Sequence, residues 1–191
     1  MTDFLFYLKL GLNHILDLDG LDHFYFIISF CILFSFKEWK KIVGLVTAFT
    51  LGHFITLFLS GLELVTINAD IVELLIPISI LLSCLNNFYV LLKGKQTKQQ
   101  LSITYIILLI FGLIHGLGFS NYIRMMLFED ESIVLPLLGF NVGIELAQLL
   151  IVTGLLAIIS VLQLIIKSHI KWVRFAVNMV IFLLVLRMIF G

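Results

Sequence analysis

The chain has 191 residues, of which 61% are hydrophobic and only 13% are charged, and its mean hydropathy is +1.17. A water-soluble domain cannot bury so much apolar surface, so the composition predicts an integral membrane protein with the lipid bilayer as its surroundings. The formal net charge is zero, and no basic cluster is interleaved with aromatic residues. This pattern argues against a nucleic-acid partner.

The N-terminal segment, residues 4–16, is expected to form a short amphipathic helix. Its apolar residues recur at helical spacing and form one stripe made of Phe4, Leu5, Leu8, Leu12, Ile15 and Leu16. A helix with one apolar face is typical of a segment that lies in the membrane interface. We therefore expect this helix to rest at the membrane surface ahead of the first span.

Six apolar stretches follow, separated by charged residues or by breaks that contain Gly and Asn. Inside hydrocarbon the backbone must satisfy its own hydrogen bonds, and these stretches lack the alternation of strands, so we expect helices. The predicted spans are 22–36, 40–61, 70–92, 101–127, 134–166 and 171–190. The fold class is therefore an all-α integral membrane protein of about six transmembrane helices, with a single polytopic membrane domain over residues 1–191.

The basic residues indicate an orientation, because they gather in three of the loops between the predicted spans. These residues are Lys37, Lys40, Lys41, Lys93, Lys95, Lys98, Lys167, Lys171 and Arg174. Loops rich in Lys and Arg stay in the cytoplasm, so both termini are expected on the outer side. The expected location is the bacterial inner membrane, with both termini facing the periplasm.

Ionisable and amide side chains occur within or beside several spans, where they are energetically costly and tend to mark functional sites. The candidates are His14, Asp17, Asp19, Asp22, His23, His53, Glu73, His115, Asn141, Glu145 and Gln148. At 1.5 Å per residue, His53 lies roughly 12 Å, Glu145 roughly 17 Å and His115 roughly 18 Å from the outer ends of their spans. The sequence thus predicts one polar site in the outer half of the bundle.

Imidazole and carboxylate groups are the ligands that nickel, cobalt, zinc and other divalent first-row metals accept. The two cysteines, Cys31 and Cys84, lie inside apolar runs without CxxC spacing, so a thiolate site for copper(I) is not expected. We therefore predict a divalent metal site. Its candidate ligands are His14, Asp22, His23, His53, His115 and Glu145.

Several candidates also have simpler interpretations. Asp22 could cap a helix or accept a hydrogen bond from His23 rather than bind a metal directly. Asn141 could form a hydrogen bond between helices, which is a common use of amides in membranes. Asp17 and Asp19 are favoured as ordinary solvated acids of an outer loop.

The motifs also carry a resemblance to a known family. In this order, HILDLDGLDHFYFIISF, FTLGHFITL, the Glu73–Pro77 segment, FGLIHGLGFS and GFNVGIELAQ resemble the HupE/UreJ family of small membrane proteins. Members of that family are associated with nickel hydrogenases and ureases and are regarded as nickel or cobalt permeases. The resemblance covers nearly the whole chain and therefore implies a metal permease.

The family carries an HxxxxxDH signature near its N-terminus and a later HG motif. The resemblance implies that His14, Asp22 and His23 correspond to the signature and that His115 corresponds to the HG motif. Here seven residues separate His14 from Asp22, where the family has five.

Two functions from different classes fit these residues. A permease would capture nickel, cobalt or a similar cation at the outer site and pass it to the cytoplasm. The alternative is an intramembrane zinc-dependent hydrolase that acts on a lipid or membrane-tethered substrate from the outer side, with Glu145 or Glu73 as general base. The inner half has amides such as Asn86 and Asn87 but no second charged site, which favours the enzyme, whereas the resemblance favours the permease. The permease is the preferred interpretation; the sequence does not identify protein partners.

Overall fold

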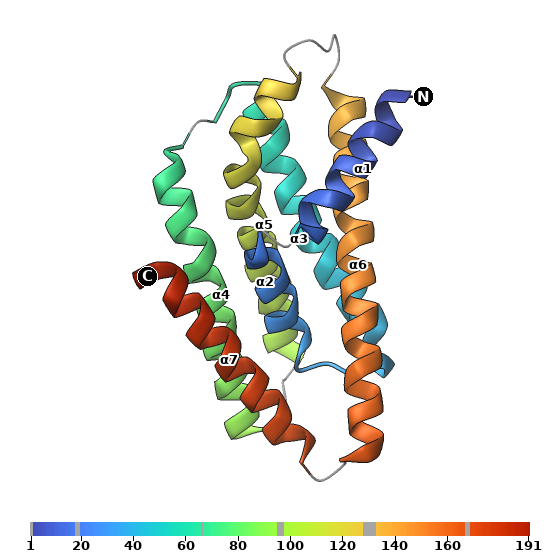
Figure 1. The fold of residues 1–191 in the computed structure, drawn as a ribbon, viewed down its shortest axis with the longest axis vertical. Coiled ribbons are helices and arrows are strands. Elements are labelled where there is room, and N and C mark those ends of the chain that lie inside the picture. Colours follow the sequence, from blue (N-terminus) through green and yellow to red (C-terminus); the bar gives the residue numbers. More distant parts are fainter. Residues whose placement is uncertain (1, 18–19, 66, 95–97, 128–132, 167–168) are drawn as a thin grey trace.

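The computed structural model is all-helical over the residues that it describes, which are 2–17, 20–65, 67–94, 98–127, 133–166 and 169–191. The elements are α1 (Thr2–Leu16), α2 (Leu21–Cys31), the short 3₁₀ helix η1 (Phe36–Glu38), α3 (Trp39–Gly61), α4 (Ala69–Lys93), α5 (Lys98–Leu127), α6 (Val134–Ile165) and α7 (Ile170–Phe190). They form an elongated bundle in which α3, α4, α5 and α6 alternate in direction (Figure 1). The all-helical part of the predicted fold class is confirmed.

Five helices are long and apolar enough to cross a membrane, namely α3, α4, α6, α7 and the 102–119 part of α5. Each lies where the sequence predicts a span. The first predicted span differs, because α2 has 11 residues and ends at Cys31 rather than continuing to residue 36. A helix of that length is too short to cross a bilayer alone, since crossing takes roughly 20 residues.

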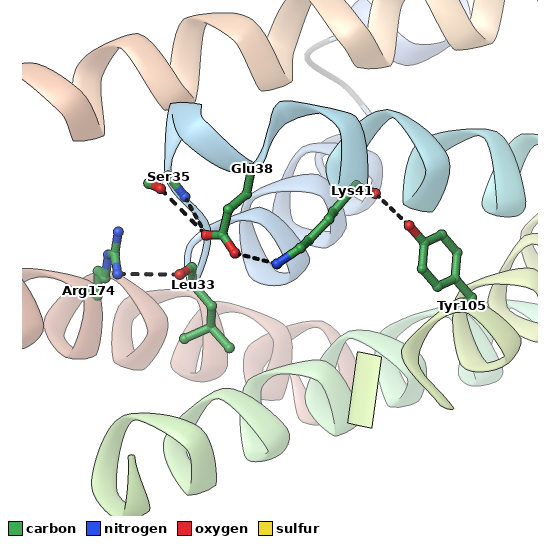
Figure 2. Close-up of polar contacts among 6 residues, drawn as sticks. All are labelled: Leu33, Ser35, Glu38, Lys41, Tyr105 and Arg174. Carbon is green, nitrogen blue, oxygen red and sulfur yellow. Dashed lines mark hydrogen bonds and ion pairs between the residues drawn. The ribbon is translucent and has the colours of Figure 1, made fainter. Parts of the chain in front are cut away.

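Side chains from distant helices explain why α2 ends early. Asn87 of α4 donates its Nδ2 hydrogen to the carbonyl oxygen of Ser29, which a longer helix would have used for its own hydrogen bond. Arg174 of α7 donates to the carbonyl oxygen of Leu33 at 3.3 Å, as Figure 2 shows, and to that of Phe34 at 3.0 Å. Because these three carbonyls have partners, the chain can leave the helix inside the bundle with fewer unpaired backbone groups.

Polar contacts also fix the chain where it enters α3. The Glu38 carboxylate accepts hydrogen bonds from the backbone nitrogen of Ser35 at 3.4 Å and from Lys41 Nζ at 2.9 Å (Figure 2). The hydroxyl of Tyr105 on α5 then donates to the backbone oxygen of Lys41 at 3.1 Å. These contacts tie α5 to the first turn of α3 at the end of the bundle that carries the basic residues.

A buried amide pair joins α2, α4 and α7. Besides its bond to Ser29, Asn87 Nδ2 donates to Asn178 Oδ1 at 2.9 Å, and Asn178 Nδ2 donates to the carbonyl oxygen of Cys84 at 3.0 Å. The two amides are 1% and 0% exposed. Inside a bilayer such amides stabilise the packing of helices only while both partners are present.

Replacing Asn87 with leucine should destabilise the protein by about 1–3 kcal/mol, because it leaves the Asn178 amide and the Ser29 carbonyl buried without their partner. The double variant N87L/N178L should cost less than the sum of the two single variants, since both amides are then gone. Thermal unfolding in detergent measures all four proteins of this cycle. If the stability losses of the two single variants sum to that of the double variant within about 0.5 kcal/mol, the two amides do not act as one network.

α1 and α6 run parallel and pack backbone against backbone. A methyl group added at Gly11 would overlap the carbonyl oxygen of Phe140, and one added at Gly143 would overlap the carbonyl oxygen of Leu8. Only glycine permits so close an approach. Gly139 and Gly143 are four residues apart, so both lie on the face of α6 that receives α1.

This packing differs from the interfacial position expected for the N-terminal helix. α1 lies alongside α6, as Figure 1 shows, and its residues Tyr7 and Ile15 are 5% and 1% exposed. Leu5 and Phe6 on the opposite face are 59% and 55% exposed. The amphipathic helix is therefore present, but its buried face packs on another helix.

α3 and α5 form a second parallel pair with the same kind of contact. A methyl group at Gly112 would overlap the carbonyl oxygen of Phe49, and one at Gly52 would overlap the carbonyl oxygen of Leu109. A methyl group at Gly116 would lie 2.7 Å from the carbonyl oxygen of His53. His53 and His115 are thus carried on two helices whose spacing is set by glycines.

Candidate metal centre

Four histidines from four helices gather in one cluster. His14 lies in the last turn of α1, His23 near the start of α2, His53 within α3 and His115 within α5. The ring centroids are 4.6 Å apart for His14 and His23, 5.7 Å for His23 and His115, and 6.3 Å for His14 and His53. The histidines predicted to share one depth therefore pack together, and we refer to these four residues as the histidine cluster.

The Nε2 atom of every histidine in the cluster is buried and has no hydrogen-bond partner among the residues that the structure describes. A buried polar atom without a partner costs about 1–3 kcal/mol, and native proteins leave few of them. Four such nitrogens in one place therefore point to a ligand that they are built to receive.

Hydrogen bonds on the other ring nitrogen fix the tautomer of His115 and His23. His115 Nδ1 lies 2.8 Å from the carbonyl oxygen of Phe111, which can only accept, so Nδ1 carries the hydrogen. His23 Nδ1 lies 3.2 Å from the Asp22 carboxylate, which accepts in the same way. In both rings Nε2 is left with a lone pair, which is the form that binds a metal. Asp22 thus takes the orienting role that the sequence allowed for it.

His53 is oriented by an amide on α6. Asn141 donates its Nδ2 hydrogen to the carbonyl oxygen of Leu137 at 2.8 Å, which turns its Oδ1 towards His53. His53 Nδ1 lies 3.4 Å from that oxygen and donates to it. Asn141 is thus the residue of α6 that belongs to the site, and it acts through His53.

The cluster opens towards one side of the molecule. A pocket of about 490 Å³ borders His14 and is lined by Leu10, Asn13, His14, Leu16, Asp17 and Phe119. Phe119 stacks on Phe140 with ring centroids 4.9 Å apart and lies 4.1 Å from His14. His53 and His115 are 0% and 2% exposed, so His14 is the histidine at the entrance.

The two glutamates predicted for the site lie elsewhere. Glu145 accepts a hydrogen bond of 2.6 Å from Thr47, and Glu73 is an exposed residue of α4. Glu145 follows Asn141 by one helical turn, a rise of about 6 Å, which takes it past the level of His53. The structure thus brings together the four histidines and Asp22 but neither glutamate. Asp17 is exposed, and Asp19 lies outside the described residues.

The fit of the cluster to a metal can be tested on its spacing. Within the described ranges, no group of three or more His, Cys, Asp or Glu side chains is arranged to hold a metal ion as it stands. Two imidazoles that share an ion at about 2.0–2.1 Å have ring centroids about 4.5–6.5 Å apart. The separations of 4.6, 5.7 and 6.3 Å between ring centroids fall in that range. The rings must therefore rotate for their nitrogens to converge on one ion.

Comparison with known proteins agrees with the motifs. The sequence model described as HupE / UreJ protein matches residues 1–191, the whole chain. Searches of curated proteins and of solved structures give no match. The family match includes every helix that contributes to the histidine cluster, and five helices are suited to cross a membrane. The chain is therefore an integral membrane protein that belongs to the HupE/UreJ family.

Proposed function

We propose that this protein carries a divalent cation of the nickel and cobalt type across the membrane and that the histidine cluster is where it binds the ion. The observation that carries this proposal is the set of four buried Nε2 atoms, which have no hydrogen-bond partner in the described part of the chain. Membership of the HupE/UreJ family supports it, because the family is associated with nickel and cobalt handling.

The donor set indicates which ions suit the site. Neutral imidazoles favour borderline ions such as Ni²⁺, Co²⁺ and Zn²⁺ over Mg²⁺ and Ca²⁺, which prefer oxygen ligands. Asp22 contacts His23 and brings a negative charge next to the cluster, which offsets part of the charge of the ion. A transported ion must also leave, and neutral ligands that must first rotate hold it less firmly than a preformed thiolate site.

The direction of access follows from the charges at the two ends of the bundle. Lys41 and Arg174 lie at the end where α2 joins α3, whereas α1 begins at the opposite end (Figures 1 and 2). The positive-inside rule assigns the basic end to the cytoplasm. The pocket at His14 then receives ions from the outer side, and α7 runs towards that side as well.

The hydrolase alternative receives no support from the described residues. A general base must lie within hydrogen-bond reach of the water or group that it deprotonates. Glu145 is bonded to Thr47 and Glu73 is exposed, so neither candidate base stands beside the imidazoles. We therefore propose transport alone.

The test is to measure ion flux in liposomes together with binding in detergent. Wild type should show saturable entry of Ni²⁺ or Co²⁺ and no entry of Mg²⁺, because nitrogen ligands discriminate between these ions. The variant H23A should lose both binding and flux. A wild type that retains tightly bound zinc, passes no ion and hydrolyses a lipid or peptide would overturn the proposal.

A further inference from the structure

A second cavity lies in the other half of the bundle, towards the basic end. It has a volume of about 360 Å³ and is lined by Phe30, Leu33, Phe34, Leu82, Ser83, Asn86, Asn87, Ile103, Thr104, Ile107, Leu108 and Phe111. These residues belong to the end of α2, to the segment that follows it, to α4 and to α5. We refer to this space as the inner cavity.

Polar side chains line the inner cavity at a depth where lipid would be unfavourable for them. Ser83, Asn86 and Asn87 come from α4, and Thr104 comes from α5. Asn86 is exposed. It lies seven residues before Lys93, the last residue of the apolar helix α4, which corresponds to a depth of about 10 Å from that end. An exposed amide at that depth is favoured only where it faces water rather than hydrocarbon.

One aromatic layer separates the inner cavity from the histidine cluster. The ring of Phe26 lies 5.0 Å from His115, 5.9 Å from Phe111 and 5.4 Å from Phe30, measured between ring centroids. Phe111 and Phe30 line the inner cavity, while the backbone oxygen of Phe111 is the acceptor that orients His115. Phe26 is fully buried, so it fills the space between the metal site and the cavity.

We infer that the inner cavity is a water-filled chamber through which the divalent cation leaves the histidine cluster, and that the Phe26 and Phe111 rings close it in this structure. The inference rests on the proposed function. Amide and hydroxyl oxygens suit such a chamber, because they can replace part of a hydration shell without holding the ion tightly. Carboxylates at the same place would trap it.

The sequence indicates no second ion site towards the cytoplasm, which counts against transport, and this chamber offers a route there. Among the described residues, the lining of the inner cavity contains no charged side chain, yet Asn86, Ser83 and Thr104 reach it from two helices. A closed aromatic layer with a cavity beyond it is also what a transporter needs, since an ion path open to both sides at once would dissipate the gradient.

Cysteine labelling tests whether the inner cavity holds water. N86C should react with a charged, membrane-impermeant methanethiosulfonate applied to the basic side of oriented proteoliposomes. L85C is the matched control, because Leu85 is the neighbouring residue, is 51% exposed and does not line the cavity. Cys31 and Cys84 are both 0% exposed, so wild type provides the background. If N86C reacts no faster than L85C from either side, the cavity is filled by lipid and the inference fails.

Filling the cavity tests its role in transport. N86F should leave metal binding in detergent unchanged and reduce ion flux at least about tenfold, because the added ring occupies the route. L85F adds the same ring on the lipid side and should keep flux within about twofold of wild type. Absence of flux in wild type would count against the proposed function itself. If N86F transports the ion as fast as wild type, the inference about the chamber fails while the proposed function stands.

Discussion

Replacing Gly112 with alanine should remove most of the folded protein. The added methyl group would overlap the backbone carbonyl oxygen of Phe49 on α3, and a backbone atom cannot move aside as a flexible side chain can. Overpacking usually costs about 1–3 kcal/mol, and we expect the upper end or more because α3 and α5 must separate as a whole. The yield of monodisperse protein and its midpoint of thermal unfolding in detergent measure the effect.

Gly154 provides the matched control for this variant. It lies in α6, and apart from the adjoining backbone of its own helix a methyl group there would meet no atom of the described residues within 4 Å. G154A should therefore be neutral or stabilising by up to about 1 kcal/mol, because alanine has the higher helix propensity. If G112A unfolds at the same temperature as G154A, the backbones of α3 and α5 do not approach as closely at Gly112 as described.

Replacing His53 with alanine should lower the affinity for Ni²⁺ or Co²⁺ by more than about 100-fold, since losing a ligand costs more than losing a residue that orients one. His53 is fully buried, and its Nε2 has no hydrogen-bond partner within the described ranges. Equilibrium dialysis of the purified variant measures the affinity. H169A removes an exposed histidine and should leave the affinity unchanged. Equal affinities for H53A and H169A would exclude His53 as a ligand.

Asn141 should show a smaller effect of the same kind. N141L removes the acceptor that orients His53, and loss of such a partner typically costs 10–100-fold in metal affinity, so we expect about that range. Q148L is the matched control, because Gln148 is a buried amide of the same helix that bonds to Thr50 instead. If both variants bind the ion equally well, the orienting role of Asn141 is wrong.

The long helices could be predicted from the sequence, since hydrophobicity alone determines which segments a bilayer accepts. The end of α2 could not be predicted in the same way. It depends on Asn87 and Arg174, which reach its terminal carbonyls from α4 and α7, and local sequence contains no record of such contacts. The predicted position of α1 at the membrane surface differs from its packing on α6 for a related reason. An apolar stripe fits a membrane surface and another helix equally well.

The histidine cluster could be predicted in outline, because helical rise converts residue number into depth and places His53 and His115 in the outer half of the bundle, on the side where His14 and His23 were expected. Asn141 and Glu145 are four residues apart and share one face of α6, so spacing alone could not say which of them is level with His53. A usable signal was present in the glycines, since Gly112 and Gly116 enclose His115 at the spacing typical of tight helix pairs in membranes.

The two glycine-packed pairs have a consequence for how firmly an ion is held. The pair α3 and α5 carries His53 and His115, whereas the pair α1 and α6 carries His14 and Asn141. Backbone contact makes each pair a stiff unit, so a rocking of one unit on the other keeps the spacing within each pair. The same rocking alters the 6.3 Å between His14 and His53 and the 3.4 Å bond from His53 to Asn141. Under the proposed function, affinity for the ion then depends on the relative position of the two units, tight when they close and weak when they part.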